Sequence, residues 1–316
     1  MSSSIEIMKN FGEFYHPEEI TDRIEDIVGY EPQKTFLDDF FRAVNSIATV
    51  GSLELPFSIS LSALLIGPPG TGKTTLAKAF AQRHNIPIFL VYADSLIGSI
   101  LGKTLNNIRD VLSAAHGFAR AKTPIIVFFD ELDAIASERS SVYEVGEIKR
   151  AVVTLLQRMD SILGSKDPIA FLGATNHQHL LDSAVWRRFC YHIAFPFPDR
   201  PMRTGIIRSF VGQIQKAGSI IMQTTDAQIE ALGSDEISGG FTGADIKRGF
   251  QIAILKALKD RILDDEILSQ SIQSAGGTQT HIDNEARMSG RSGTDSGTGP
   301  PAVLENRQTL KPKRII

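Results

Sequence analysis

A glycine-rich run with a single lysine could hold phosphate. Residues 67–74 read Gly-Pro-Pro-Gly-Thr-Gly-Lys-Thr, the pattern G-x-x-x-x-G-K-[ST]. The glycines of such a loop let the backbone turn, so that successive N–H groups face an anion at the start of a helix. Lys73 would reach the β- and γ-phosphates, and the Thr74 hydroxyl would bind Mg²⁺. The expected nucleotide contacts along this run are Pro69, Gly70, Thr71, Gly72, Lys73, Thr74 and Thr75.

Two acids directly follow a short apolar run, and this arrangement suits water activation. Residues 125–129 read Ile-Ile-Val-Phe-Phe, and Asp130 and Glu131 come next. Asp130 would hold Mg²⁺ through its water shell, and Glu131 would orient and polarise the attacking water as a general base. An ordinary strand end could show the same pattern. The P-loop upstream favours catalysis, and the second acid favours hydrolysis over binding alone, because one carboxylate suffices for Mg²⁺.

These residues need strands and helices to position them, and apolar patterning supplies both. Strands are predicted over 61–66, 86–92, 125–129 and 169–172, and helices over 27–44, 74–83, 105–121 and 148–163. Strands that alternate with helices predict an α/β fold, the parallel sheet of a P-loop NTPase sandwiched by helices. Nucleotide would then bind at the carboxyl ends of the strands.

The strand pattern stops after Phe195-Pro-Phe-Pro198, and helical spacing continues over 202–216, 226–232 and 243–259. We therefore expect four parts: an arm or linker (1–25), a large α/β domain (26–198), a small all-helical lid (199–268) and a largely disordered tail (269–316). The tail is rich in Ser, Gly, Thr and Gln, which bury too little apolar area to offset the entropy of ordering. Its basic and apolar end, 310–316, is either frayed or a docking peptide.

Composition narrows the class of protein. The chain has 316 residues, and 33 basic against 36 acidic side chains give a net charge of −3. Nothing in this balance requires a nucleic-acid partner. Its one cysteine, Cys190, cannot form a disulfide within the chain, which fits a reducing compartment such as the cytoplasm. We find no signal peptide and no apolar run near the ~20 residues of a membrane span.

Four further motifs follow the P-loop in a fixed order. They are Phe129-Asp-Glu-Leu-Asp-Ala-Ile135, Gly173-Ala-Thr-Asn176, Arg187-Arg-Phe189 and Gly240-Phe-Thr-Gly-Ala-Asp245. Together with the P-loop they resemble the AAA branch of the AAA+ ATPases, which includes katanin, spastin and the proteasomal ATPases. The resemblance covers about residues 24–260 and implies Mg²⁺-dependent hydrolysis of ATP to ADP and phosphate.

The resemblance also assigns roles to single residues. Asn176 matches the asparagine that senses the γ-phosphate, although a turn-forming Asn is an alternative. Arg187 and Arg188 match arginine fingers that reach the neighbouring subunit's ATP, where charge on the phosphate oxygens must be neutralised. Trp186 stands where many relatives carry a further Arg, so the choice between the two fingers stays open, and one of them could form an ordinary salt bridge.

The adenine side of the site is also assigned by resemblance. The matching positions are Ile27, Val28, Gly29, Ile206, Phe210, Gly243 and Ala244. Gly243 and Ala244 would let adenine and ribose lie against the backbone. Ile206 and Phe210 could equally pack only within the helical core of the lid.

A loop that grips substrate in threading relatives matches residues 96–102. Ile100, with Leu101 beside it, occupies the position of an aromatic residue. An aliphatic side chain could still intercalate between substrate side chains, but its grip would differ. None of the seven histidines belongs to an H-E-x-x-H pair, the signature of a fused zinc protease.

The resemblance implies a homo-oligomeric ring, expected to be a hexamer, that remodels, unfolds or disassembles a protein client. A separate adaptor or protease could choose or process that client. Two alternatives stay open: an ATPase that acts on nucleic acid or as a loader, and a slow nucleotide-gated scaffold. The absence of a basic run interleaved with aromatics opposes the first alternative. The intact set Lys73, Asp130, Glu131 and Asn176 opposes the second.

Overall fold

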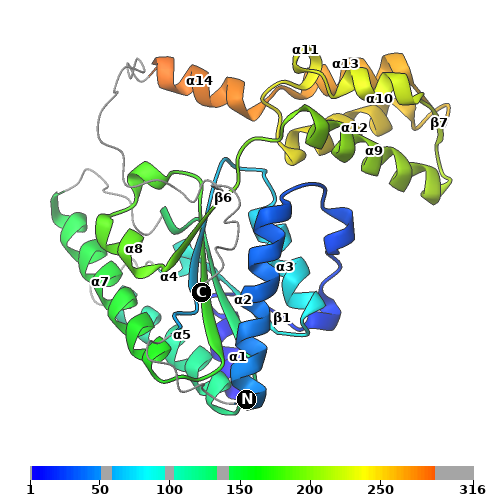
Figure 1. Ribbon diagram of the computed structural model, residues 1–316. Coiled ribbons are helices and arrows are strands. Elements are labelled where there is room, and N and C mark those ends of the chain that lie inside the picture. Colours follow the sequence, from blue (N-terminus) through cyan, green and yellow to red (C-terminus); the bar gives the residue numbers. More distant parts are fainter. Residues whose placement is uncertain (1, 51–58, 97–102, 134–141, 289–316) are drawn as a thin grey trace, which may run out of the picture.

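A six-stranded sheet forms the centre of the computed structural model, which describes residues 2–50, 59–96, 103–133 and 142–288 (Figure 1). The strands lie in the order β1-β3-β4-β5-β2-β6; β1 is antiparallel to β3 and the other pairs are parallel. They are β1 (Gly12–Tyr15), β2 (Ser62–Ile66), β3 (Ile88–Tyr92), β4 (Ile125–Asp130), β5 (Ile169–Thr175) and β6 (Tyr191–Ala194). The predicted α/β sandwich is confirmed.

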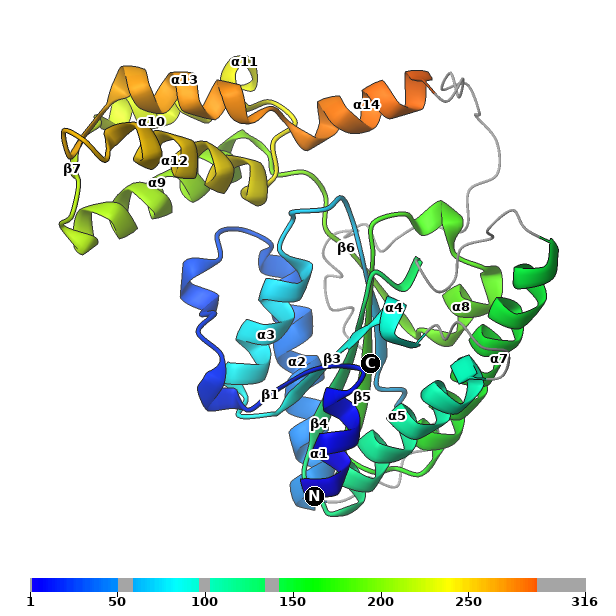
Figure 2. The same ribbon diagram turned by 180° about the vertical axis from the view of Figure 1, so that it is seen from behind.

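Helices cover both faces of this sheet (Figures 1 and 2). One face carries α2 (Glu31–Val50) and α3 (Lys73–Arg83), and the other carries α1 (Ser2–Lys9), α5 (Lys103–Arg120), α7 (Val142–Gly164) and α8 (Ser183–Arg188). Alternate strand residues feed the two cores: Phe129 packs on the α5 side and Phe128 on the α3 side. The short segments are α4 (Ala93–Leu96), η1 (Pro17–Glu19), η2 (Ile24–Asp26) and η3 (Gln178–Leu180).

Strand register brings the chemically interesting residues to one edge. Ile66 pairs with Thr175, and Tyr92 pairs with Asp130. Because β5 lies between β4 and β2, the residue after β5 sits between the acids that follow β4 and the loop that follows β2. Parallel strands share their carboxyl ends, so these three segments converge.

The first 25 residues differ from the expected arm or linker. They form α1, β1, η1 and η2, and Met8, Phe14 and Ile20 are buried. Strand β1 hydrogen bonds along β3, and Met8 packs in the core between the sheet and α5. Polar residues between these few apolar side chains hid the pattern from sequence reasoning.

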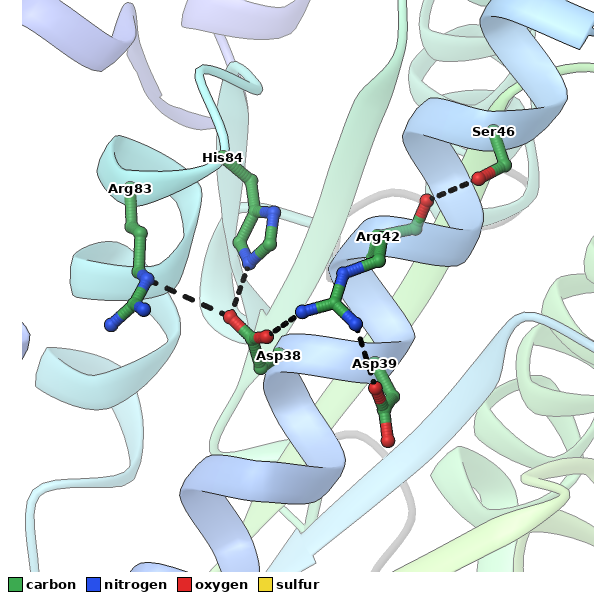
Figure 3. Close-up of polar contacts among 6 residues, drawn as sticks. All are labelled: Asp38, Asp39, Arg42, Ser46, Arg83 and His84. Carbon is green, nitrogen blue, oxygen red and sulfur yellow. Dashed lines mark hydrogen bonds and ion pairs between the residues drawn. The ribbon is translucent and has the colours of Figure 1, made fainter.

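An ion cluster joins α2 to the carboxyl end of α3, the helix that begins at the P-loop (Figure 3). The Asp38 carboxylate accepts from His84 Nε2 at 2.9 Å and is paired with Arg42 and with Arg83, whose Nε lies 3.6 Å away. The His84 ring lies against Phe41, with centroids 5.9 Å apart. These contacts fix α3 against α2 at the end of the helix farthest from the loop.

The smaller unit follows β6 and is built mainly of helices (Figure 2). Its elements are α9 (Arg200–Ala217), β7 (Ile221–Gln223), α10 (Asp226–Leu232), α11 (Asp235–Ser238), α12 (Gly243–Ala257), β8 (Ile262–Asp264), α13 (Asp265–Ala275) and α14 (Thr278–Met288). The parallel pair β7–β8 is an addition that helical patterning did not predict. No helix in the described part of the chain is long and apolar enough to cross a membrane.

Residues 269–288 were predicted to be disordered, and this prediction was wrong. They continue as α13 and α14. Leu268, Ile272 and Ala275 are buried in the lid core at helical spacing, and Gly249 of α12 lets α13 approach closely: a Cβ at Gly249 would lie 2.8 Å from the Ile272 Cα. Three well-spaced apolar residues outweigh a Ser- and Gln-rich composition. The rest of the predicted tail, 289–316, lies outside the described residues.

Arg203 ties the lid to the linker that leaves the sheet. Its side chain is buried, and its guanidinium donates to the carbonyls of Pro198 at 2.9 Å and Gly233 at 3.0 Å, and to Ser238 Oγ at 3.2 Å. It is also paired with Asp235. A planar group with five donors thus fixes the linker and the α10–α11 turn relative to each other.

Asp245 joins two helices of the lid. Its carboxylate is buried and accepts from the Thr242 N–H and hydroxyl, both at 2.9 Å, in a capping box at the start of α12. The same carboxylate accepts from the Thr278 N–H, the first residue of α14, at 3.0 Å. One side chain therefore sets the starting direction of both helices.

We expect Met8→Ala to lower the free energy of unfolding by about 2–5 kcal/mol, because it removes a fully buried side chain and leaves a cavity. The matched control is Ile7→Ala, one residue earlier on α1, whose side chain is 39% exposed and whose loss should cost less than about 1 kcal/mol. Urea unfolding measures both. Equal stability of the two variants would show that the amino-terminal segment is not part of the folded core.

Candidate nucleotide site

The loop between β2 and α3 has the shape that the glycine pattern predicted. Gly70 (φ 79°) and Gly72 (φ 87°) adopt left-handed conformations, which glycine reaches without a Cβ clash. A Cβ at Gly67 would lie 2.2 Å from the Phe195 carbonyl oxygen, so only glycine fits beside the chain that leaves β6. Thr71 is buried, and its hydroxyl donates back to the loop. The loop is therefore fixed from both sides.

Lys73 uses all three of its donors at the sheet edge. Its Nζ donates to the carbonyls of Gly67 at 2.7 Å and Pro68 at 2.9 Å, and to Asn176 Oδ1 at 2.8 Å. The last bond joins the P-loop to the residue after β5. Two residues that were matched to phosphate contacts, 103 positions apart in sequence, thus lie in direct contact.

Burial changes the charge equilibrium of this lysine. Burial lowers the pKa of Lys73 to about 8, and the carboxylates of Asp130 and Asp133 partly oppose the change. A phosphate group beside the ammonium would act in the same direction as these carboxylates and favour the charged form.

A hydroxyl and a carboxylate meet beside the lysine. Thr74 Oγ1 donates to Asp130 Oδ2 at 2.9 Å. Oxygen ligands of this kind suit Mg²⁺, which prefers one or two protein ligands together with water and phosphate oxygens. The donor set therefore fits the predicted Mg²⁺ site, with Thr74 and Asp130 as the residues that would hold the ion.

Glu131 lies at a sharp turn directly after β4. Its φ of 50° is unusual for a residue with a side chain, and its N–H donates to Asp130 Oδ1 at 3.0 Å. The Glu131 carboxylate is exposed and forms no hydrogen bond or ion pair with any described residue. This turn separates the two acids, so that one faces Thr74 and the other is available to solvent.

Asp133 is a residue of the site to which sequence reasoning gave no role. Its Oδ1 accepts from Thr175 Oγ1 at 2.8 Å and from the Asn176 N–H at 3.3 Å. It thereby holds the end of β5, and with it the Asn176 side chain, against the turn after β4. A third carboxylate within four residues of Asp130 was the available signal.

Several residues that were matched to adenine contacts lie where the lid meets the large domain. The Ala244 N–H donates to the Gly70 carbonyl at 3.2 Å, and a Cβ at Gly243 would lie 3.6 Å from the same oxygen. Gly29 (φ 76°) lies against Met202 of α9. The start of α12 therefore contacts the P-loop directly.

The other matched adenine residues are divided between the two units. Ile27 is partly buried in the core of the large domain, and Val28 packs against Gly205 of α9. Ile206 and Phe210 pack against the lid core, where the Phe210 ring lies 5.3 Å from that of Phe250. Packing within the lid thus accounts for part of their surface. Ile100 and Leu101 lie outside the described residues.

The two arginines of α8 differ in their surroundings. Arg188 is ion paired with Asp160 of α7. Arg187 is exposed and forms no hydrogen bond or ion pair with a described residue. Neither is bonded to the P-loop or to Asp130, Glu131 or Asp133 of the same chain. The structure brings Lys73, Thr74, Asp130 and Asn176 together and leaves Arg187 facing solvent.

We expect nucleotide affinity to fall as the pH rises above about 8, where the free chain loses the Lys73 proton that phosphate requires. Each further pH unit should weaken binding by up to about tenfold. Titration of a fluorescent ATP analogue at pH 7, 8 and 9 measures this, with Lys73→Met as a weak and pH-independent control. Equal affinity at pH 7 and 9 would contradict the assignment.

The same pKa predicts the pH dependence of stability without nucleotide. The folded pKa of Lys73 is below the unfolded value of 10.5, so the unfolded chain binds more protons between these values. Stability should therefore rise between pH 8 and 10.5, and this contribution should be absent in Lys73→Met.

We expect Asp133→Ala to lower the rate of ATP turnover about 10- to 100-fold, because Asn176 loses the group that orients it. At pH 7 nucleotide affinity should change little, since Asp133 binds neither the loop nor Thr74 and is the smallest of the three influences on the Lys73 pKa. Asp133→Asn keeps an oxygen acceptor and should retain most of the activity. A folded Asp133→Ala variant with unchanged turnover would show that Asn176 needs no such support.

Comparisons with known proteins agree with this geometry. The model of the AAA family, ATPase family associated with various cellular activities, matches residues 63–197. The ATP-dependent zinc metalloprotease YME1 homolog of Caenorhabditis elegans is 30% identical over 254 residues, 79% of this chain and 32% of that protein. The uncharacterized AAA family ATPase y4kL of Sinorhizobium fredii is 43% identical over 140 residues, 44% of this chain and 40% of that protein. The chain spans about a third of the length of the metalloproteases it matches.

Solved structures with the same fold extend over nearly the whole chain. The AAA domain of FIGL-1 in complex with ADP has a TM-score of 0.69 and 22% identity, over 92% of this chain and 96% of that chain. A chain of the HORMA:CdnC:Trip13 complex of E. coli MS115-1 has a TM-score of 0.69 and 20% identity, over 85% of this chain and 97% of that chain. The motifs and fold of the present chain, together with these relatives, show that it belongs to the AAA family of AAA+ ATPases.

Proposed function

We propose that the chain hydrolyses Mg²⁺-bound ATP and uses the energy to remodel a protein client. The observation that carries the proposal is the pair of side-chain bonds at the sheet edge, Lys73 to Asn176 and Thr74 to Asp130. They join a phosphate-binding loop, a Mg²⁺ ligand set and a polar group from the intervening strand. A site for nucleotide binding alone would not need Glu131 as well.

The residues divide the chemistry between them. Lys73 exchanges a loop carbonyl for a phosphate oxygen, and the N–H groups of the loop bind the remaining oxygens. Thr74 and Asp130 would hold Mg²⁺, which would supply positive charge beside the phosphates. Glu131, exposed beyond the turn, orients the attacking water, and Asn176 holds a hydrogen bond to that water or to the γ-phosphate.

A further positive charge beside the γ-phosphate comes from an arginine of a second copy of the chain. Phosphoryl transfer is accelerated by an arginine near the γ-phosphate, and Arg187 is the arginine of α8 that forms no ion pair with a described residue. It is not bonded to its own P-loop, so it acts on the site of a neighbour. A repeated head-to-tail contact of this kind closes into a ring, which we propose to be a hexamer. Arg188 remains with Asp160 and holds α8 in place.

Hydrolysis becomes movement through the lid. The start of α12 is bonded to the P-loop at Gly70, so a change of nucleotide alters the position of the lid relative to the sheet. Several relatives are named ATP-dependent zinc metalloproteases, and a HORMA protein accompanies Trip13 in one structure of this fold. By analogy, a protein client and a separate adaptor or protease are the partners proposed here. The single cysteine favours the cytoplasm as the location.

We expect Arg187→Ala to lower turnover about 10³-fold or more, and Glu131→Gln to abolish it. Activity should return when Arg187→Ala subunits are mixed with Glu131→Gln subunits. The first kind supplies an intact Glu131, and the second supplies an intact Arg187 to its neighbour. Arg188→Ala should lose less activity, because Arg188 is paired within its own chain. Phosphate release in mixtures measures this.

Two results would contradict the trans arrangement: mixtures that stay inactive, and an Arg187→Ala variant that hydrolyses ATP at the normal rate. The client is identified by capture on Glu131→Gln in ATP and mass spectrometry. Stimulation of turnover by DNA or RNA would point instead to a nucleic-acid client, and negligible turnover by the unmodified chain would point to a nucleotide-gated scaffold.

A further inference from the structure

The turn that carries Arg187 is anchored on its carboxyl side. Phe189 is fully buried in the core, and Ser62 of β2 binds the backbone on both sides of it: its Oγ donates to the Arg188 carbonyl and accepts from the Cys190 N–H, both at 3.1 Å. With the pair of Arg188 and Asp160, these contacts fix residues 188–190. They do not reach the residue that precedes Arg187.

A stacked pair of rings holds that preceding residue. The Trp186 indole lies flat on the His192 imidazole, with centroids 4.0 Å apart and planes inclined by only 8°. His192 Nε2 lies 3.0 Å from the Trp186 carbonyl oxygen. Trp186 itself is partly buried against the core of the large domain. Ring and backbone of Trp186 are thus both held by one histidine of β6.

The chemical state of the histidine fits this role. Burial lowers the pKa of His192, so the ring is neutral near neutral pH and carries one N–H. That N–H, at Nε2, donates to the Trp186 carbonyl, one of the terminal carbonyls of α8 that have no partner within the helix. His192 therefore acts as a cap from an adjacent strand, and β6 pairs with β2 at the base of the P-loop.

Arg187 lies between these two sets of anchors. The residues on either side of it are fixed, whereas its own guanidinium is not bonded to any described residue. A long side chain on a rigid backbone loses less freedom when it binds a phosphate than one on a mobile turn. We propose that Trp186 and His192 are positioning residues that aim Arg187 at the ATP of the neighbouring subunit, an inference that rests on the trans role of Arg187 proposed above.

The test distinguishes a misplaced Arg187, which affects the neighbour's site, from a defect in the subunit's own active site or fold. His192→Ala removes both the stack and the cap, and should lower turnover about 10- to 100-fold through misplacement of Arg187. We call the stacked and hydrogen-bonded pair Trp186 and His192 the brace. Glu131→Gln subunits have an intact brace and an intact Arg187. In randomly mixed rings about a quarter of the sites combine a His192→Ala active site with a finger from a Glu131→Gln neighbour. Activity should therefore recover toward a quarter of the unmodified level.

The conservative variants order the contributions. Trp186→Phe keeps an aromatic ring and the same backbone carbonyl, and should lose less activity than His192→Ala. His192→Gln keeps an N–H donor without the stack and should be intermediate. His84→Ala is the matched control, because it removes another stacked histidine of this domain, which is bonded to Asp38 (Figure 3). His84 follows α3, which packs on the face of the sheet opposite to α8. Any loss in His84→Ala should not be recovered by Glu131→Gln subunits.

Trp186 is the only tryptophan of the chain, so its fluorescence reports the brace directly. Emission should change in His192→Ala and stay as in the unmodified chain in Arg187→Ala. Failure of Arg187→Ala and Glu131→Gln to complement each other would overturn the trans finger itself. If that pair recovers, the brace is overturned by a folded His192→Ala with normal turnover, or with a loss that mixing does not recover.

Discussion

A buried ammonium group governs the sheet edge. Lys73 is buried, so its three N–H donors need acceptors within the protein. They donate to two carbonyls of the P-loop and to the amide oxygen of Asn176. This requirement links the loop after β2 to the end of β5, and the Thr74–Asp130 bond extends the link to β4. A phosphate would enter a network whose geometry is already set by an unfavourable burial of charge.

Sequence patterns predicted the parts of the molecule in which the residue type is required by the conformation or burial of its own segment. Glycines at 70 and 72 are required by backbone conformation, and the apolar run of β4 by burial on both faces. The strand order itself was not predicted, because β2 lies between β5 and β6, which come much later in the sequence. That the residues after parallel strands share one edge of the sheet could be expected from the fold class alone. Lys73 and Asn176, 103 positions apart, were both expected at a nucleotide site, and the structure places them in direct contact.

The remaining features depend on partners that are distant in sequence. Met8 is one of a few apolar residues scattered through a polar stretch, and its segment becomes part of the fold by pairing with β3 and packing on α5. The function of Asp133 depends on two donors at the end of another strand, and that of His192 on the ring of Trp186. Choosing Arg187 over Arg188 required seeing that Asp160 is within reach of one of them. Spacing along the chain contains no information on these contacts.

The shared carboxylate of Asp245 has a mechanical consequence. The amino end of α12 touches the P-loop, and the amino end of α14 is bonded to the same buried oxygen that caps α12. A small rotation of α12 about that point would therefore produce a larger displacement at the carboxyl end of α14. A change at the nucleotide site would thereby be transmitted to the carboxyl end of α14.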